Sequence, residues 1–204
     1  MITLGRFPSC LAALTLVLTS LLSAYSQTGA SPTLSARAKS LTVERWNSRS
    51  FSNAVEILAD SHETKESRGT AIEMIQANRK KLSAAEMNQA LKQITAVAHD
   101  NNEDELVAAS AIRTMGNMAL TMRELGQISD AESKKESAFL LSAAKDAKRA
   151  SHFRTSAITT LGILKSSEAT PMLLELLAES QSMNVAELSR PACLALMQIG
   201  RAHV

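Results

Sequence analysis

The densest group of potential metal ligands is the sequence His-Asp-Asn-Asn-Glu-Asp-Glu, which ends at Glu105. Asp100, Asn102 and Asp104 stand at alternate positions, as the first ligands of a calcium-binding loop do. The pattern then fails, because Glu105 occupies the place of the required glycine and Ala111 that of the bidentate glutamate. A helix that has Asn102 as its N-cap and acids in its first turn explains the same residues. We therefore predict no metal site here.

The other residues of catalytic type form no recognised motif. His62-Glu63-x-x-Glu66 lacks the second histidine of a zinc-protease helix and suits a solvated turn. The sequence contains no Gly-x-Ser-x-Gly and no glycine-rich phosphate loop. Cys193 lies in an apolar helical run and is predicted to be a small core residue, not a nucleophile. We predict a protein that is not an enzyme and that uses no cofactor.

The composition is typical of a folded helical protein. Of 204 residues, 45% are hydrophobic and 21% charged, with few aromatic residues and glycines, which argues against an all-β fold. The net charge of +2 gives no positive excess to attract phosphates, so we expect no nucleic-acid partner. The expected fold class is all-α.

Residues 1–26 are predicted to be a secretory signal peptide. Their apolar block, residues 11–22, is too short to span a bilayer but matches the core of a signal. Ala24 and Ser26 supply the small residues that cleavage needs, so the mature chain would begin at Gln27. We expect export to the periplasm or the extracellular space. The alternative is an uncleaved N-terminal anchor that holds a scaffold at the membrane.

Beyond the signal, the sequence predicts a lead-in and one helical domain. Residues 27–48 are rich in Ser, Thr, Ala and Gln and are predicted to be flexible, with a short helix possible over 41–46. Over residues 49–204, apolar side chains recur at steps of three and four, which predicts a series of short helices. Ser83 and Glu86 have the spacing of a capping box at the start of one of them.

Four of these helices share one pattern, in which an alanine is followed by apolar residues one and four positions later. They begin at Ala71, Ala111, Ala157 and Ala192, at steps of 40, 46 and 35 residues. Such steps are typical of helical-hairpin repeats of the HEAT and armadillo type. The small alanines let helices approach, and no single hairpin can bury its own apolar face. The pattern predicts a short, right-handed α-solenoid of about four hairpins.

The chain resembles the HEAT-like repeat family, which includes the repeats named after phycobilisome lyases. The resemblance is carried by Leu-Gly-Ile-Leu, ending at Leu164, and by the following Ser-Glu-Ala-Thr-Pro-Met-Leu-Leu-Glu-Leu-Leu. Arg68 and Arg154, three residues before a repeat alanine, match an arginine common in the family, whereas Ala108 and Ser189 stand there in the other repeats. The resemblance implies the solenoid fold. It leaves open a lyase-like enzyme or enzyme accessory that handles a small molecule.

In a solenoid of this kind the second helices of the hairpins line the concave face. Their predicted outward positions are Glu73, Arg113, Asn117, Thr159, Leu194 and Gln198. We predict that the protein is an interaction or scaffold module that binds a peptide or a folded protein along this face; simple solvation is the alternative. The last hairpin leaves an apolar end, through which a homodimer can form.

Overall fold

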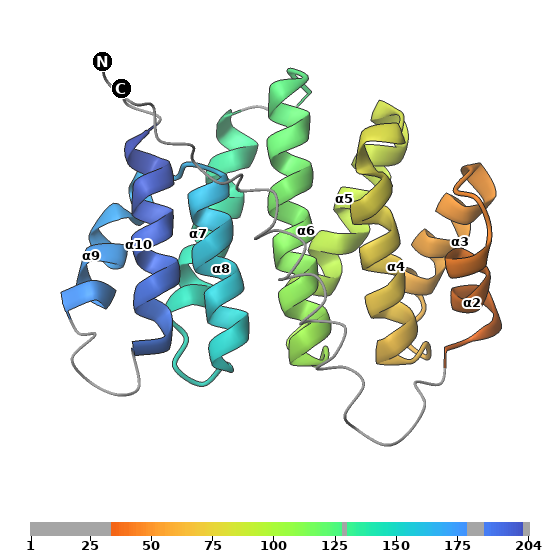
Figure 1. Ribbon diagram of the computed structural model, residues 1–204, viewed down its shortest axis with the longest axis horizontal. Helices are drawn as coiled ribbons and strands as arrows, with labels where there is room; N and C mark the ends of the chain where they lie inside the picture. The colour runs from red at the N-terminus through yellow and green to blue at the C-terminus, as the bar shows by residue number, and fades with distance from the viewer. Residues whose placement is uncertain (1–33, 128–129, 179–185, 202–204) are drawn as a thin grey trace, which may run out of the picture. The chain divides into compact units, whose positions relative to one another are not determined.

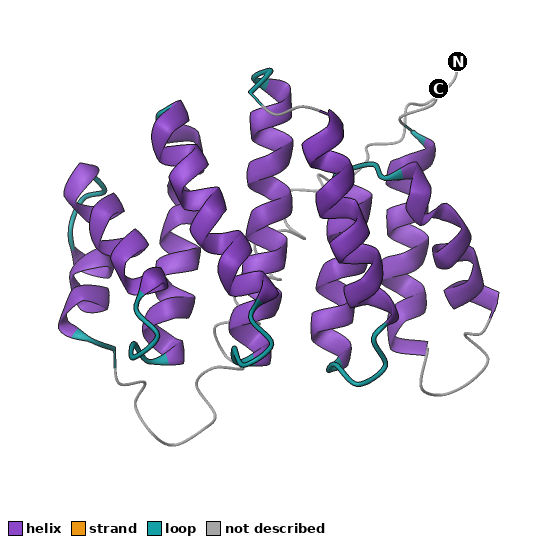
Figure 2. Ribbon diagram, turned by 180° about the vertical axis from the view of Figure 1, so that it is seen from behind, coloured by secondary structure: helices purple, strands orange, loops and turns teal. Residues whose placement is uncertain are grey.

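The computed structural model describes residues 34–127, 130–178 and 186–201. Within these ranges the regular elements are all helices, without a strand, which confirms the predicted all-α class (Figures 1 and 2). One compact unit begins at Leu34. The predicted signal peptide and its cleavage site near Ser26 lie outside the described residues.

The helices follow one another with short connections. In chain order they are α2 (Ala36–Val43), α3 (Ser48–Ala59), α4 (Lys65–Asn78), the 3-10 turn η1 (Arg79–Lys81), α5 (Ala84–His99), α6 (Glu105–Glu124), α7 (Asp130–Lys145), α8 (Ser151–Ile163), the 3-10 turn η2 (Ser167–Ala169), α9 (Thr170–Ala178) and α10 (Ala186–Gly200).

Neighbouring helices pair into hairpins. Helix α3 packs on α4, α5 on α6, α7 on α8 and α9 on α10. The second helices also pack on one another in sequence, α4 on α6, α6 on α8 and α8 on α10, and they stand side by side in Figure 1. Figure 2 shows from behind the layer that contains α3, α5, α7 and α9. Helix α2 packs on α3 and α4, so this part of the predicted lead-in belongs to the compact unit.

Short polar side chains fix where the helices begin. Side chains that accept a hydrogen bond from the first turn cap α2 to α6 in order: Ser35, Asn47, Thr64, Ser83 and Asp104. The predicted capping box is confirmed, because the Ser83 N–H donates to Glu86 Oε2 at 2.8 Å. The predicted cap Asn102 is wrong. Its N–H donates to Asp100 Oδ1 at 2.9 Å within a turn, and Asp104 caps α6 instead.

Two glycines permit the closest approach between the second helices. Gly116 of α6 faces the side chain of Thr160 in α8. A Cβ on Gly162 of α8 would lie 2.7 Å from the Cα of Ala195 in α10 and 2.6 Å from Gln198 Oε1. A side chain at Gly162 is therefore excluded unless the helices move apart, whereas one at Gly116 requires at least that the Thr160 side chain move.

The buried core contains most of the predicted apolar stripes. All four repeat alanines are fully buried. In α7 the spacing of apolar residues predicts a buried side made of Ala138, Phe139, Leu141 and Ala144. In the structure Ala144 is buried, but Ala138 is exposed and Leu140 is buried instead. Phe139 lies at the edge of this core, where its ring stacks on that of His99 at 3.6 Å. The apolar spacing of residues 106–118 also predicts a buried Leu106, but this side chain is 49% exposed in the first turn of α6.

The prediction that Cys193 is a core residue is wrong, because Cys193 is exposed. Its equivalents Ile112 and Ile158 are fully buried between successive hairpins. Helix α10 packs on α8 and α9, and no later hairpin follows it in the described part of the chain. The same sequence position is therefore buried in an inner hairpin and open in the last one.

Other helix boundaries differ from the sequence predictions. The short helix expected over 41–46 begins earlier, at Ala36, since Ala38 and Leu41 supply its buried side. For the last helix the sequence offers Asn184 or Ser189 as the starting residue. Ser189 does not start it, because Ser189 and Pro191 both lie inside α10, and Asn184 is outside the described residues.

Candidate functional site

The six predicted binding residues lie on the four second helices. They are Glu73 on α4, Arg113 and Asn117 on α6, Thr159 on α8, and Leu194 and Gln198 on α10. None of the six is buried. The structure brings Glu73 and Arg113 close enough for their charges to interact. The side chain of Gln198 lies beside Gly162 and therefore at the joint between α8 and α10.

Glu73 and Arg113 are exposed to solvent, yet the protein around them desolvates their charges. Burial raises the pKa of the Glu73 carboxyl, and the positive charge of Arg113 offsets part of that rise. Burial likewise lowers the pKa of the Arg113 guanidinium, and Glu73 offsets part of that effect. Charges in such surroundings are screened less than charges on an open surface, so they interact more strongly with each other and with a ligand.

Replacing Glu73 by glutamine should remove a pH-dependent loss of stability. Because the pKa of Glu73 is raised in the folded state, the folded protein binds this proton more tightly than the unfolded chain does. The wild type therefore loses stability as pH rises from the unfolded pKa, about 4.3, through the raised value. Urea unfolding between pH 4 and 7 should show the stability of the Glu73→Gln variant increasing relative to wild type as pH rises. A constant difference would contradict the desolvation of Glu73.

Three turns of one design join the helices of the first three hairpins. Each contains an aspartate that accepts a hydrogen bond from the backbone N–H two residues later: Asp60 at 3.0 Å, Asp100 at 2.9 Å and Asp146 at 3.0 Å. The aspartates are 40 and 46 residues apart, the same steps that separate the first three repeat alanines. These aspartates were not predicted to be functional, although their common spacing is visible in the sequence.

The residue three positions after each aspartate forms an ion pair with an earlier helix. We name these pairs the turn ladder: Glu63–Arg37 at 3.1 Å, Glu103–Arg68 at 2.7 Å and Arg149–Glu105 at 2.6 Å. The third pair has its charges reversed relative to the first two. The second is the most enclosed, with the Arg68 and Glu103 side chains 12% and 5% exposed. The ladder ties each of the first three hairpins to the helix or hairpin before it.

Arg68 and Arg154 also close their own hairpins. Arg68 Nη2 donates to the carbonyl of Leu58 at 3.5 Å, and Arg154 Nε donates to that of Ala144 at 2.9 Å. Each carbonyl lies near the C-terminus of the first helix, where backbone acceptors lack helical partners and a positive charge is favourable. These two arginines therefore hold the hairpins together.

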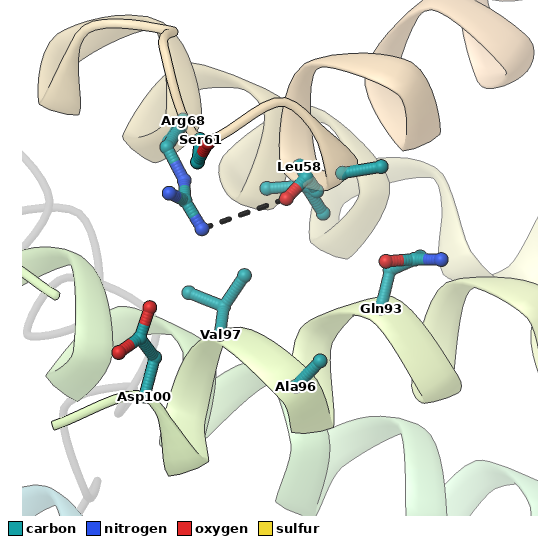
Figure 3. A pocket seen from close by; sticks show the side chains of 8 residues that line it. Leu58, Ser61, Arg68, Gln93, Ala96, Val97 and Asp100 are labelled. Carbon is teal, nitrogen blue, oxygen red and sulfur yellow. Dashed lines mark hydrogen bonds between the residues drawn. The ribbon is translucent and has the colours of Figure 1, made fainter. Parts of the chain in front are cut away.

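A pocket of about 190 Å³ opens between α3, the following turn and α5 (Figure 3). Its lining residues are Leu58, Ala59, Ser61, Arg68, Gln93, Ala96, Val97 and Asp100. Figure 3 shows the Arg68 guanidinium on one side of the opening, with Asp100 on the other. The pocket is smaller than the roughly 300–1,000 Å³ of most small-molecule sites. Arg68 is already engaged by Glu103 and by the Leu58 carbonyl.

The acidic residues around the second turn have structural partners. Asp104 caps α6, Glu103 pairs with Arg68, and Glu105 pairs with Arg149. Among the residues that the structure describes, no group of three or more His, Cys, Asp or Glu side chains is placed to hold a metal ion. In the same part of the chain, no helix is both long enough and apolar enough to cross a membrane.

Comparisons with models of known families, with curated proteins and with solved structures give no match for this chain. Its function is therefore inferred from the residues and contacts described above.

Proposed function

We propose that this chain is a right-handed HEAT-like α-solenoid that binds an extended segment of a protein partner along the concave face of α4, α6, α8 and α10. The serial packing of these four helices supports the proposal, as do the close joints at Gly116 and Gly162. The predicted N-terminal signal peptide supports export, so the proposed partner would lie outside the cytoplasm.

The observation that carries the binding role is the pair Glu73 and Arg113. Both side chains reach solvent, and both are desolvated by the surrounding protein. A side chain on a convex or flat surface is well solvated, whereas one on a concave surface is both accessible and enclosed. A polar partner group placed here would meet charges that water screens only weakly.

The chemistry of the face changes along its length, and this restricts the partner. The charged pair lies on α4 and α6, whereas α10 presents Leu194, which is 51% exposed. Packed helices are separated by about 8–10 Å, so three successive joints span roughly 24–30 Å. An extended chain covers this distance with about eight residues. The proposed partner segment is polar where it crosses α6 and apolar where it crosses α10.

The rival role, a lyase-like enzyme or accessory for a small molecule, requires a deep pocket with convergent polar groups. The pocket between α3 and α5 is small, and it lies on the first helices of the hairpins rather than on the proposed face. This pocket therefore does not support the rival role.

The Arg113→Ala/Asn117→Ala variant tests the proposal. The full chain is used to capture partners from native extract, and each captured protein is then divided into synthetic peptides for direct titration. We expect one peptide to bind the wild type and to lose about tenfold in affinity with the variant, because two polar contacts are removed.

A matched control carries Gln89→Ala and Lys92→Ala on α5, where both side chains are exposed on the opposite layer. This control should bind like the wild type, and circular dichroism should show equal helicity for all three proteins. If the Arg113→Ala/Asn117→Ala variant binds as tightly as the wild type, the binding site does not lie on this face. Stabilisation by a metabolite, with no peptide bound, would favour the rival role.

A further inference from the structure

Helix α10 lacks the glycine that the close joints of α6 and α8 use. In α6 and α8 the fifth residue after the repeat alanine is a glycine, and the next helix packs against it. The equivalent residue of α10 is Met197, which is 50% exposed. A methionine at this point excludes a further helix at the same short distance. Any helix that covers this face must pack at a larger interaxial distance, because large side chains lie between the two helices.

The exposed face of α10 has the spacing of such a seam. Its members, at steps of three and four residues, are Glu187, Arg190, Leu194, Met197 and Arg201, which we call the α10 seam. All five are exposed. The Arg201 N–H donates to the carbonyl of Met197 at 3.2 Å, so Arg201 continues the last helical turn. Steps of this kind place side chains on one side of a helix, as in a coiled-coil interface.

Two charges of the α10 seam, Glu187 and Arg201, can pair with their counterparts in a second copy, whereas Arg190 faces the neutral Gln198. Glu187 and Arg201 stand seven residues before and after Leu194, about 10 Å from it in each direction. When two such helices run antiparallel, each Glu187 meets the partner's Arg201, and the apolar residues meet in the middle. Because the arrangement has two-fold symmetry, the Glu187–Arg201 contact occurs twice.

We propose that α10 of one copy packs antiparallel against α10 of a second copy, about a two-fold axis at Leu194. Leu194 and Met197 form the apolar centre of this interface, and two Glu187–Arg201 ion pairs close its ends. The interface is small, so the dimer is weak and exchanges with monomer. The dimer covers Leu194, which the proposed partner segment also contacts, so the two interactions compete for α10. The Arg113→Ala/Asn117→Ala test of partner binding changes only residues on α6 and leaves the dimer interface intact.

Sedimentation equilibrium of the full chain tests the dimer, at loading concentrations from about 1 to 500 μM, where small interfaces dissociate. A reductant in the buffer keeps the exposed Cys193 from joining two copies through a disulfide. We expect the mass to rise from monomer to dimer over this range. Leu194→Ala should weaken the dimer at least tenfold, because the substitution acts twice at the centre.

Two further sets of variants separate this interface from unspecific association. Leu174→Ala, on the 55% exposed Leu174 of α9, should leave the dissociation constant unchanged. Glu187→Arg and Arg201→Glu alone should each weaken the dimer about five- to tenfold, since each places like charges together twice. The variant with both changes should recover the wild-type constant. A monomer at every concentration, an equal effect of Leu174→Ala, or no recovery in the double variant would overturn the proposal.

Discussion

The free energy of unfolding of the Gly162→Ala variant should be about 1–3 kcal/mol lower than that of the wild type, the usual cost of overfilling a packed interior. The added Cβ would lie 2.7 Å from the Cα of Ala195. Because Cα is a backbone atom, a rotamer change cannot relieve the contact, and α10 must move away from α8. Urea unfolding followed by circular dichroism at 222 nm measures the loss.

Gly69→Ala is the matched control for this prediction. Gly69 also lies inside a helix, α4, but a Cβ there would meet nothing within 4 Å. Alanine restricts the unfolded chain more than glycine does, so this variant should gain up to about 1 kcal/mol. Opposite signs for the two variants would verify the close joint. A gain in both would show that α8 and α10 are further apart than described.

Replacing Arg68 by alanine should cost about 3–5 kcal/mol, the usual penalty for removing one partner of an enclosed ion pair. Glu103 would be left 5% exposed without its cation, and with Asp100 and Asp104 near it. The hydrogen bond to the Leu58 carbonyl would also be lost. For a chain of this size the midpoint of thermal unfolding should fall by about 2–4 °C for each kcal/mol.

Two comparisons identify the cause of this loss. Arg154→Ala removes a carbonyl hydrogen bond from an equivalent position and should cost only about 1 kcal/mol. Replacing Arg68 and Glu103 together by methionine removes both charges and should recover most of the stability. If the double variant is as unstable as Arg68→Ala, the arginine acts through its packing and not through the ion pair.

The Arg68→Ala variant should also respond to acid. Burial already raises the pKa of Glu103 in the wild type, and the charge of Arg68 offsets part of that rise. Without Arg68 the folded-state pKa rises further, so the folded variant binds a proton more readily than the unfolded chain. Its stability should therefore increase relative to wild type as pH falls from 7 towards the unfolded pKa. The same unfolding experiments, repeated at pH 5, measure this.

Much of the helical architecture follows from local sequence. The capping box at Ser83 depends on residues three positions apart, and the buried alanines depend on a periodicity within one helix. Both are decided by neighbours along the chain, which a sequence contains directly. The predicted cap of α6 was wrong because Asn102 and Asp104 are both residues that cap helices well. In the structure Asn102 belongs to the turn that Asp100 stabilises, so Asp104 is the cap.

For the candidate site, the sequence predicted only which residues lie on the second helices, not which of them interact. Counting along the helices placed six side chains on the second helices, outside the buried stripes. It did not reveal that Glu73 and Arg113 influence each other, because they are 40 residues apart and meet only when α4 packs on α6. The pairs of the turn ladder were missed for the same reason, even though their aspartates recur at the repeat spacing.

By itself the sequence determined that the chain is helical, where most helices lie, and which residues repeat, since these depend on local propensity and periodicity. Only the tertiary structure decided which repeated positions are buried. Ile112, Ile158 and Cys193 occupy the same place in their helices, and the first two are buried because another hairpin packs beyond them. Whether a side chain is buried depends on the helix that packs against it, and that helix comes from a distant part of the sequence.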